Sequence, residues 1–175
     1  MQIGIFADSH DHLDHIRKAV MVFNQRRCET VLFAGDLVST LAIPPLQELD
    51  CPLVACFGDN EVNKVGPLAG IKIVGVLGEL PFSFVAADGT RFLLSDIKIH
   101  LRDLNGEFDV AVYAHSHKPK ITRDAKERLY INPGETSGWT FNDPTIVILD
   151  TASKQITLIH LKDQAEYVSM DKVSG

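Results

Sequence analysis

The chain has 175 residues, 45% of them hydrophobic and 23% charged, which is an ordinary composition for a globular protein. This length predicts one domain that buries roughly 70% of its unfolded surface without disulfide staples. The formal net charge of -6 argues against a surface that binds nucleic acid by general electrostatic attraction. Three cysteines without metal-type spacing, no visible signal peptide and no apolar stretch near ~20 residues indicate a reducing, cytoplasmic setting and no membrane span.

The first half of the chain alternates short apolar runs with helical patterns. Strands are predicted over residues 2–7, 30–34 and 53–57 because each run is rich in β-forming residues and ends on Gly or polar residues. An amphipathic helix is predicted over 16–27, and a second begins over 41–46, with its two prolines in the first turn. This β-α-β-α-β order predicts a parallel core.

The second half has the pattern of an antiparallel sheet, with Asp88-Gly89 as a strong hairpin signal. The predicted elements are strands over 82–87, 91–94, 109–114, 145–149 and 155–161 and a short helical segment over 101–104. The two halves together predict an α/β fold of two stacked mixed sheets with helices outside. We expect residues 1–161 to form the single domain and residues 162–175, which are polar and aperiodic, to form a frayed tail.

Five of the apolar runs end on a cluster of Asp, His or Asn. The clusters are Asp8-Ser9-His10, Gly35-Asp36, Gly58-Asp59-Asn60-Glu61, Ser95-Asp96 and His115-Ser116-His117. In open α/β sheets the residues just past the carboxyl ends of the strands meet in one crevice. Four carboxylates and three imidazoles would therefore converge on one spot, where only bound metal ions can offset their repulsion and burial.

The types of these side chains narrow the choice of metal and of chemistry. Mixed carboxylate and imidazole ligation suits Mn²⁺, Fe, Ni²⁺ or Zn²⁺ rather than Ca²⁺. Because seven candidate ligands exceed what one tetrahedral ion takes, we expect two ions that share a bridging carboxylate. Asp36 is the expected bridge because it follows the central strand. Two metals can clamp both oxygens of an in-line displacement and acidify a water, which favours phosphoester hydrolysis.

Together with Ala114-His115-Ser116-His117-Lys118-Pro119 and Ile131-Asn132-Pro133-Gly134, these clusters resemble the ordered motifs of the calcineurin-like metallophosphoesterases. Ile131-Asn132-Pro133-Gly134 resembles a hallmark of their small YfcE-like and Vps29-like branch, and the resemblance as a whole extends from residue 1 to about residue 160. It implies a four-layer αββα sandwich and a dinuclear phosphodiesterase that uses a metal-bound hydroxide and no covalent intermediate.

The same resemblance assigns the site residues by motif match. One metal would take Asp8, His10, Asp36 and His117, and the other would take Asp36, Asp59, Asp96 and His115. The catalytic residues would be Asp36, Asn60 and His115. The substrate would be a small phosphoester, and homo-oligomerisation is left open.

Two positions of the second metal set depart from the family pattern. Asp59 stands where the family has Asn, and Asp96-Ile97 stands where it has His-Gly. The four aspartates together carry about -4, which neutralises two divalent ions, whereas the usual set leaves the centre near +2. A neutral centre attracts phosphate less, acidifies water less and favours Mn²⁺ or Mg²⁺ over Zn²⁺, so Mn²⁺ is the expected metal.

A third departure concerns the leaving group. Asn60 stands where many members of the superfamily have a His that acts as general acid, and an amide cannot serve this role at neutral pH. Glu61 could assist through a water, although its simpler interpretation is an acid at a helix start.

Several residues outside the clusters carry weaker signals. Trp139 and Phe141 could form a substrate wall or an interface patch, although ordinary packing is the simpler expectation. His12 could contact substrate, but we expect it to be solvated like His15. Asn132-Pro133-Gly134 is most simply a turn, and His100 and His160 have no evident partners and are interpreted as structural.

Two other functions stay open at this point. The acidic second site suits a weakly catalytic or non-catalytic Vps29-like scaffold that binds proteins, and a mononuclear metal protein with other chemistry is a third possibility. Cleavage of bis-p-nitrophenyl phosphate by the Mn²⁺-loaded protein would distinguish the enzyme from both.

Overall fold

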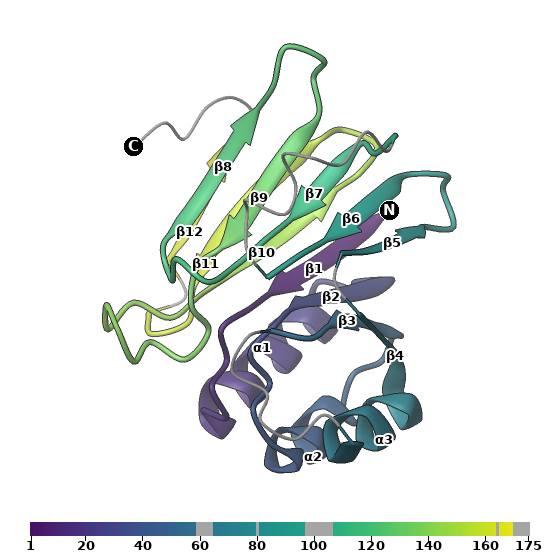
Figure 1. The fold of residues 1–175 in the computed structure, drawn as a ribbon. Helices are drawn as coiled ribbons and strands as arrows, with labels where there is room; N and C mark the ends of the chain where they lie inside the picture. Colours follow the sequence, from purple (N-terminus) through teal and green to yellow (C-terminus); the bar gives the residue numbers. More distant parts are fainter. Residues whose placement is uncertain (59–64, 80, 97–106, 164, 170–175) are drawn as a thin grey trace.

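The computed structural model describes residues 1–58, 65–79, 81–96, 107–163 and 165–169 (Figure 1). The described residues form two mixed β-sheets with a small number of helices, which confirms the predicted α/β fold. The predictions for Asp59, Asn60, Glu61, His100 and the helical segment over 101–104 lie outside these residues.

The larger sheet has seven strands in the order β12-β11-β10-β1-β2-β3-β4. Its strands are β1 (Gln2–Phe6), β2 (Thr30–Ala34), β3 (Leu53–Cys56), β4 (Gly75–Gly78), β10 (Thr145–Asp150), β11 (Gln155–His160) and β12 (Glu166–Ser169). Strands β1 to β4 run parallel to one another, as the sequence predicts for the first three, whereas β10 and β11 form the predicted antiparallel hairpin. The carboxyl ends of β1 and β2 therefore lie side by side.

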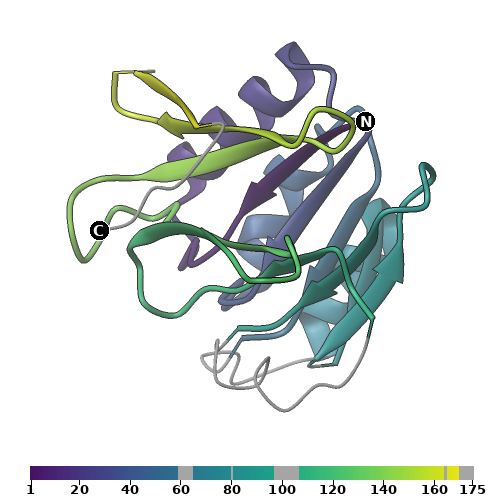
Figure 2. The ribbon, with the colours of Figure 1, turned by 90° about the horizontal axis from the view of Figure 1, so that it is seen from above.

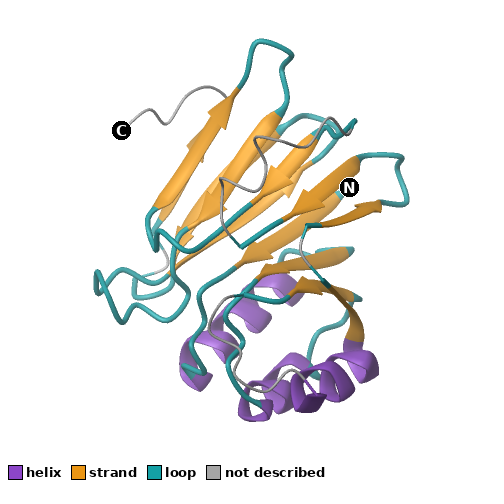
Figure 3. Ribbon diagram, viewed as in Figure 1, coloured by secondary structure: helices purple, strands orange, loops and turns teal. Residues whose placement is uncertain are grey.

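The helices cover the outer face of this sheet (Figures 1 and 3). They are α1 (Leu13–Gln25), the short 3₁₀ turn η1 (Thr40–Ala42), α2 (Ile43–Leu46) and α3 (Val65–Val74). Phe6 and Phe33 from the sheet and Phe23 from α1 form a buried aromatic cluster, with Phe6 4.5 Å from Phe33 and 5.8 Å from Phe23 between ring centroids. Helix α1 begins before the predicted residue 16 because the His12 ring accepts a hydrogen bond from the backbone N–H of His15 and caps it.

The smaller sheet has five strands in the order β5-β6-β7-β9-β8. They are β5 (Phe82–Val85), β6 (Arg91–Leu94), β7 (Val110–Val112), β8 (Pro119–Arg123) and β9 (Leu129–Pro133). The β5–β6 hairpin is as predicted, and the hairpin of β8 and β9 is an addition. The two sheets face each other (Figure 2). Alternate residues of both sheets, such as Ile5, Leu32, Val112 and Ile131, fill the layer between them.

The outer face of the smaller sheet carries a separate cluster formed by Leu93, Phe108, Ala111 and Tyr113. No helix covers this face among residues 1–58, 65–79, 81–96, 107–163 and 165–169. The fourth layer of the predicted αββα sandwich therefore stays a prediction. In the same part of the chain, no helix is long and apolar enough to cross a membrane.

The expectation of a frayed tail is wrong for Glu166–Ser169. These residues form β12, which pairs antiparallel with β11. Two side-chain contacts accompany this pairing. Glu166 forms an ion pair with Arg26, the residue that follows α1, and the Tyr167 ring packs edge-on against His160, 5.3 Å between centroids. His160 also has a charged neighbour, since its Nδ1 lies 2.6 Å from Asp143 Oδ1.

Candidate metal centre

Four of the predicted ligands meet where β1, β2 and β7 end. Asp8 and His10 follow β1, Asp36 follows β2, and His117 lies in the loop between β7 and β8. One ligand atom from each of these four residues lies within 4.8 Å of the others. We call these residues the four-residue cluster. They are the set that the resemblance assigns to one metal, and they come from strand ends that are up to about a hundred residues apart.

The backbone at this cluster is held in an uncommon conformation. Five of the six predicted ligands that the structure describes have positive φ: Asp8 at 48°, His10 at 40°, Asp36 at 63°, His115 at 66° and His117 at 59°. Left-handed backbone is uncommon for residues other than glycine and persists only where surrounding contacts fix it. Here the N–H of Asp8 donates to Gly35 O at 3.2 Å, and the N–H of His10 donates to Asp36 O at 3.1 Å. The two strand-end loops thus fix each other.

Gly58, at the end of the third parallel strand, explains how the Asp36 carboxylate is placed. A Cβ at position 58 would lie 2.3 Å from Asp36 Oδ1 and 2.4 Å from Asp36 N, so any side chain there would displace Asp36. Gly58 is therefore required because Asp36 approaches it closely, and not because of a turn.

The electrostatics of the four-residue cluster suit a bound divalent cation. Asp8 Oδ2 and His10 Nε2 are buried and have no hydrogen-bond partner among the described residues. His10 Nε2 faces Asp36 Oδ2 at 3.4 Å, and the His10 and His117 rings stack with centroids 5.1 Å apart. Burial raises the pKa of Asp8 to about 7, and the nearby Asp36 adds to this, while His117 opposes it. A cation would satisfy the unpartnered atoms and relieve this repulsion.

We expect divalent metal binding to weaken as the pH falls below about 7, the value to which the pKa of Asp8 is raised. A cation must then displace the Asp8 proton, so the affinity for Mn²⁺ falls by up to about tenfold per pH unit for that proton. For the metal-free protein, the native state holds this proton between pH 3.8 and about 7 while the unfolded state does not. Its stability should therefore decrease as the pH rises through that interval.

Calorimetric Mn²⁺ titrations in buffers of different ionisation enthalpy would measure the protons released at each pH. Asp8→Asn should release one proton fewer at pH 6 than the native chain. Equal proton release by the two proteins would contradict the assignment of the proton to Asp8.

A further carboxylate, Glu135, orients His117 and is not among the predicted site residues. Glu135 is fully buried, and its Oε2 lies 2.9 Å from His117 Nδ1. The backbone N–H groups of Thr140 and Phe141 donate to the same carboxylate at 2.9 Å and 2.6 Å. Burial raises the pKa of Glu135, but the hydrogen bonds from His117, Phe141 and Thr140 together outweigh it and hold that pKa below its usual value. An ionised Glu135 therefore fixes the proton of His117 on Nδ1 and leaves Nε2 for the cluster.

The segment before Glu135 is predicted to be a turn, but Asn132 and Pro133 are the last two residues of β9. The Asn132 side chain accepts from the N–H of Gly134 at 2.9 Å and donates to Ala114 O at 3.1 Å and to Ser116 Oγ at 3.0 Å. These hydrogen bonds tie the loop of His115 and His117 to the end of β9, and Glu135 follows next to His117. The Asn-Pro-Gly motif was the one sequence signal close to Glu135.

The second predicted metal set is assembled only in part. Asp96 is 1% exposed, and its Oδ2 lies 3.9 Å from His115 Nδ1, whose side chain is half exposed. Both adjoin the four-residue cluster: a Cβ on Gly35 would lie 2.9 Å from Asp96 Oδ1, and the N–H of His115 donates to Asp8 Oδ1 at 3.3 Å. Neither residue belongs to the cluster itself. Asp59, the remaining member, lies outside the described residues.

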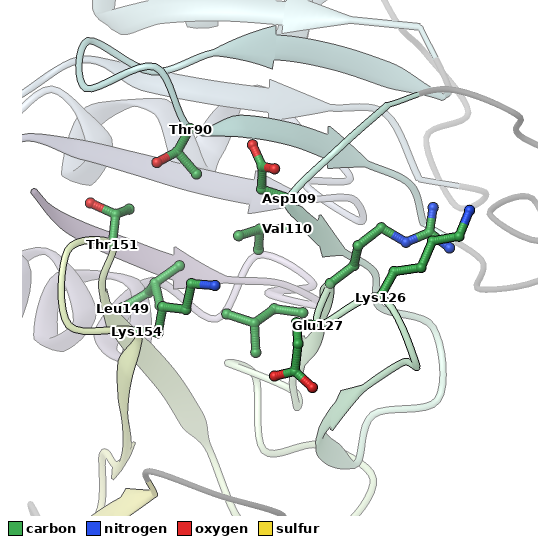
Figure 4. A pocket seen from close by; sticks show the side chains of 10 residues that line it. Thr90, Asp109, Val110, Lys126, Glu127, Leu149, Thr151 and Lys154 are labelled. Atoms are coloured by element: carbon green, nitrogen blue, oxygen red, sulfur yellow. The ribbon is translucent and has the colours of Figure 1, made fainter.

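A pocket of about 210 Å³ opens at the other end of the two sheets, where β7 and β9 begin (Figure 4). Its charged lining residues are Asp109, Lys126, Glu127, Arg128 and Lys154. The carboxylate of Asp109 is already bound by Arg91, at 2.9 Å and 3.1 Å, which holds the pKa of Asp109 below its usual value. This pocket lacks the mixed carboxylate and imidazole donors of the strand ends.

Comparison with known proteins agrees with this geometry. Residues 1–154 match the calcineurin-like phosphoesterase superfamily domain. The chain belongs to this superfamily. It is 33% identical over 167 residues to phosphodiesterase MJ0936 of Methanocaldococcus jannaschii, an alignment that covers 93% of this chain and 100% of that protein. The family and this relative together support a phosphoesterase enzyme that binds divalent metal.

Solved structures agree at the level of the fold. A structure described as a novel archaeal phosphodiesterase has a TM-score of 0.84 and 32% identity, covering 91% of this chain and 99% of that one. YfcE, a phosphoesterase from E. coli, has a TM-score of 0.73 and 17% identity, covering 97% and 98% of the two chains. Vps29 from Chaetomium thermophilum has a TM-score of 0.67 and 19% identity, covering 99% and 97%. The last two show a shared fold only.

Proposed function

We propose that this protein is a metal-dependent phosphodiesterase whose active site lies at the ends of β1, β2 and β7. The observation that carries the proposal is the four-residue cluster of Asp8, His10, Asp36 and His117. Within it, the buried atoms Asp8 Oδ2 and His10 Nε2 have no hydrogen-bond partner among the described residues. The 33% identical relative is named as a phosphodiesterase, which supports the substrate class.

We assign one divalent ion to the four-residue cluster and a second to Asp36, Asp59, Asp96 and His115, with Mn²⁺ as the first choice and Mg²⁺, Fe, Ni²⁺ or Zn²⁺ as alternatives. Bound divalent ions supply positive charge to the phosphoryl oxygens and lower the pKa of a water. Asp36 would bridge the two ions, and Glu135 would keep the His117 proton away from them. Because Asn60 cannot protonate a leaving group, we infer that the substrate is a small phosphodiester with a good leaving group.

We place this activity in a reducing, cytoplasmic compartment. The three cysteines are free thiols, and burial raises the pKa of Cys28 to about 12 and that of Cys51 to about 11. Such thiols are unreactive and suit a protein that has no structural disulfide.

The test is hydrolysis of bis-p-nitrophenyl phosphate by the purified protein after removal of bound metal and reloading with Mn²⁺, Mg²⁺, Fe²⁺, Ni²⁺ or Zn²⁺ in turn. We expect turnover with Mn²⁺ and none with the metal-free protein. Absence of turnover with every metal would favour the Vps29-like scaffold, which the acidic second site also suits.

We expect Asp96→His to raise kcat/KM for bis-p-nitrophenyl phosphate by about tenfold, roughly 1.4 kcal/mol of activation free energy. Asp96 is buried against Gly35 and beside His115, so its charge acts on the centre with little screening by solvent. Replacing it with a neutral imidazole restores net positive charge and keeps a metal ligand.

Asp96→Asn is the matched control because it removes the charge without supplying an imidazole. Inhibition by inorganic phosphate should become tighter in both variants, whereas only the histidine variant should turn over faster. A lower or equal rate in Asp96→His, with phosphate inhibition as in the native chain, would contradict the electrostatic argument.

A further inference from the structure

Trp139, the single tryptophan of the chain, stands beside the four-residue cluster in the loop that joins β9 to β10. Its side chain is 66% exposed, yet it is anchored from two sides. Its Nε1–H donates to the carbonyl oxygen of His10 at 3.4 Å, and its ring packs on the ring of His12, 4.7 Å between centroids. A large aromatic ring is therefore held next to a predicted metal ligand with much of its surface open to solvent.

The support behind Trp139 is itself fixed. His12 stacks on His15 with centroids 3.8 Å apart and ring planes 6° apart, and His15 Nδ1 donates to Ser137 O at 2.8 Å. Burial lowers the pKa of His15, and the neighbouring His12 and Lys18 lower it further, so the neutral ring that stacks without charge repulsion is favoured. Trp139 and the His12 ring behind it, which we call the platform, therefore have a defined orientation.

The same loop is connected to the metal cluster on its other side. Glu135 accepts hydrogen bonds from the N–H groups of Thr140 and Phe141 and from His117 Nδ1. Phe141 is 45% exposed, and Lys118 Nζ lies 4.7 Å from its ring centroid. The loop thus presents two exposed aromatic rings beside the cluster, and Lys118 of the loop between β7 and β8 adds a cation. The N–H of Ser137 in the β9–β10 loop donates to Asp8 O at 3.2 Å.

We propose that Trp139, supported by His12, stacks on a planar aromatic ring carried by the phosphodiester substrate, either an aryl ester or a nucleobase. This inference rests on the proposed function and specifies its substrate class. Stacking of a base on a protein aromatic ring tolerates any planar ring, so it selects aromatic esters over aliphatic ones. The Lys118 ammonium adds positive charge for the anionic phosphodiester beside an otherwise acidic cluster.

Binding to the platform can be measured without turnover, because all intrinsic tryptophan fluorescence arises from Trp139. The Mn²⁺-loaded protein would be titrated with adenosine 5′-monophosphate, phenyl phosphate and ribose 5-phosphate. We expect saturable quenching with the first two and none with ribose 5-phosphate, which offers a phosphate without an aromatic ring. Quenching by adenosine monophosphate alone assigns the platform to nucleobases. No saturable quenching by either ring, or equal quenching by all three compounds, would overturn the proposal.

A kinetic comparison uses two diesters with the same leaving group, bis-p-nitrophenyl phosphate and ethyl p-nitrophenyl phosphate. Trp139→Ala should lower kcat/KM for the diaryl ester about tenfold more than for the ethyl ester, mainly through KM, and Trp139→Phe should recover most of the difference. Each substrate is compared between variants, so the intrinsic reactivities of the two esters cancel.

The two experiments separate failure of this inference from failure of the proposed function. If Trp139→Ala lowered kcat/KM equally for both esters, the platform proposal would fail and the proposed phosphodiesterase activity would stand. Saturable quenching without turnover would keep the ring site and remove the phosphodiesterase. If Trp139→Ala instead changed the oligomeric mass while both substrates were affected alike, Trp139 would belong to an interface and the proposal would fail.

Discussion

Asp36→Asn is expected to abolish Mn²⁺ binding at the four-residue cluster and to lower phosphodiesterase kcat/KM by a factor on the order of 10³ or more. Asp36 is fully buried, faces His10 Nε2 at 3.4 Å and lies against Gly58. The amide keeps the shape of the side chain and removes the charge that would hold both ions. Asp36→Ala should have the same effect on activity.

The stability of the metal-free protein separates this loss from misfolding. The charge of Asp36 contributes to the raised pKa of Asp8, so its removal relieves repulsion and should leave the metal-free melting temperature unchanged or higher. The increase in melting temperature on adding Mn²⁺ should disappear, because a ligand stabilises only a state that binds it.

Asp14→Asn is the matched control for this substitution. Asp14 lies on α1 with an 81% exposed side chain and forms an ion pair with Arg17 at 3.0 Å, away from the cluster. It should retain both Mn²⁺ binding and turnover. Native-like Mn²⁺ affinity in Asp36→Asn would contradict the proposed site.

That the strand ends of the four-residue cluster meet could be predicted from the order of the strands. The choice of Asp8, His10, Asp36 and His117 as one ligand set rests on the resemblance to the family motifs. Asp8 and His10 are two residues apart at a strand end, and β1 and β2 are adjacent and parallel, so their ends coincide. The same reasoning succeeded for the β5–β6 and β10–β11 hairpins, whose partners are close in sequence and joined by strong turn residues.

Helix α3 could not be predicted, because its local sequence disfavours a helix. It contains Gly70 and neighbouring Gly and Pro residues that disfavour a helix interior. Packing supplies the missing stability: Ile71 is fully buried, and a Cβ on Gly70 would lie 2.6 Å from Ile43 Cγ1. The glycine lets α3 approach α2 closely, and no pattern within residues 65–74 reveals that contact.

Glu135 was beyond sequence prediction for a related reason. It is 18 residues from His117. A metal ligand and the residue that orients it have no fixed spacing in sequence, so no motif indicates the pair. The contact exists because β9 lies beside β7. At the end of β9, the hydrogen bond from the N–H of Gly134 to the Asn132 side chain directs the following residue toward His117. Side chains that directly follow strands can be predicted to meet. The hydrogen bonds that orient them depend on how the connecting loops pack.

We expect Glu135→Gln to weaken Mn²⁺ binding by about 10- to 100-fold, the usual effect of losing a carboxylate that orients a metal-binding histidine. The amide can still accept a hydrogen bond from Thr140 or Phe141, but it removes the negative charge beside His117 Nδ1. His117 then becomes a weaker electron donor and is free to change tautomer. Calorimetric titration with Mn²⁺ measures the change, and Glu48→Gln, an exposed change outside the cluster, is the control.

Two further readouts distinguish orientation of His117 from a purely structural role. In the metal-free protein, ¹⁵N shifts of the His117 ring should show the Nδ1–H tautomer in the native chain and a mixture of tautomers in Glu135→Gln. Glu135→Asp should recover part of the Mn²⁺ affinity because it restores the charge. If Glu135→Gln instead lowered the melting temperature of the metal-free protein while leaving both Mn²⁺ affinity and the His117 tautomer unchanged, the buried carboxylate would serve only to hold the loop of Thr140 and Phe141.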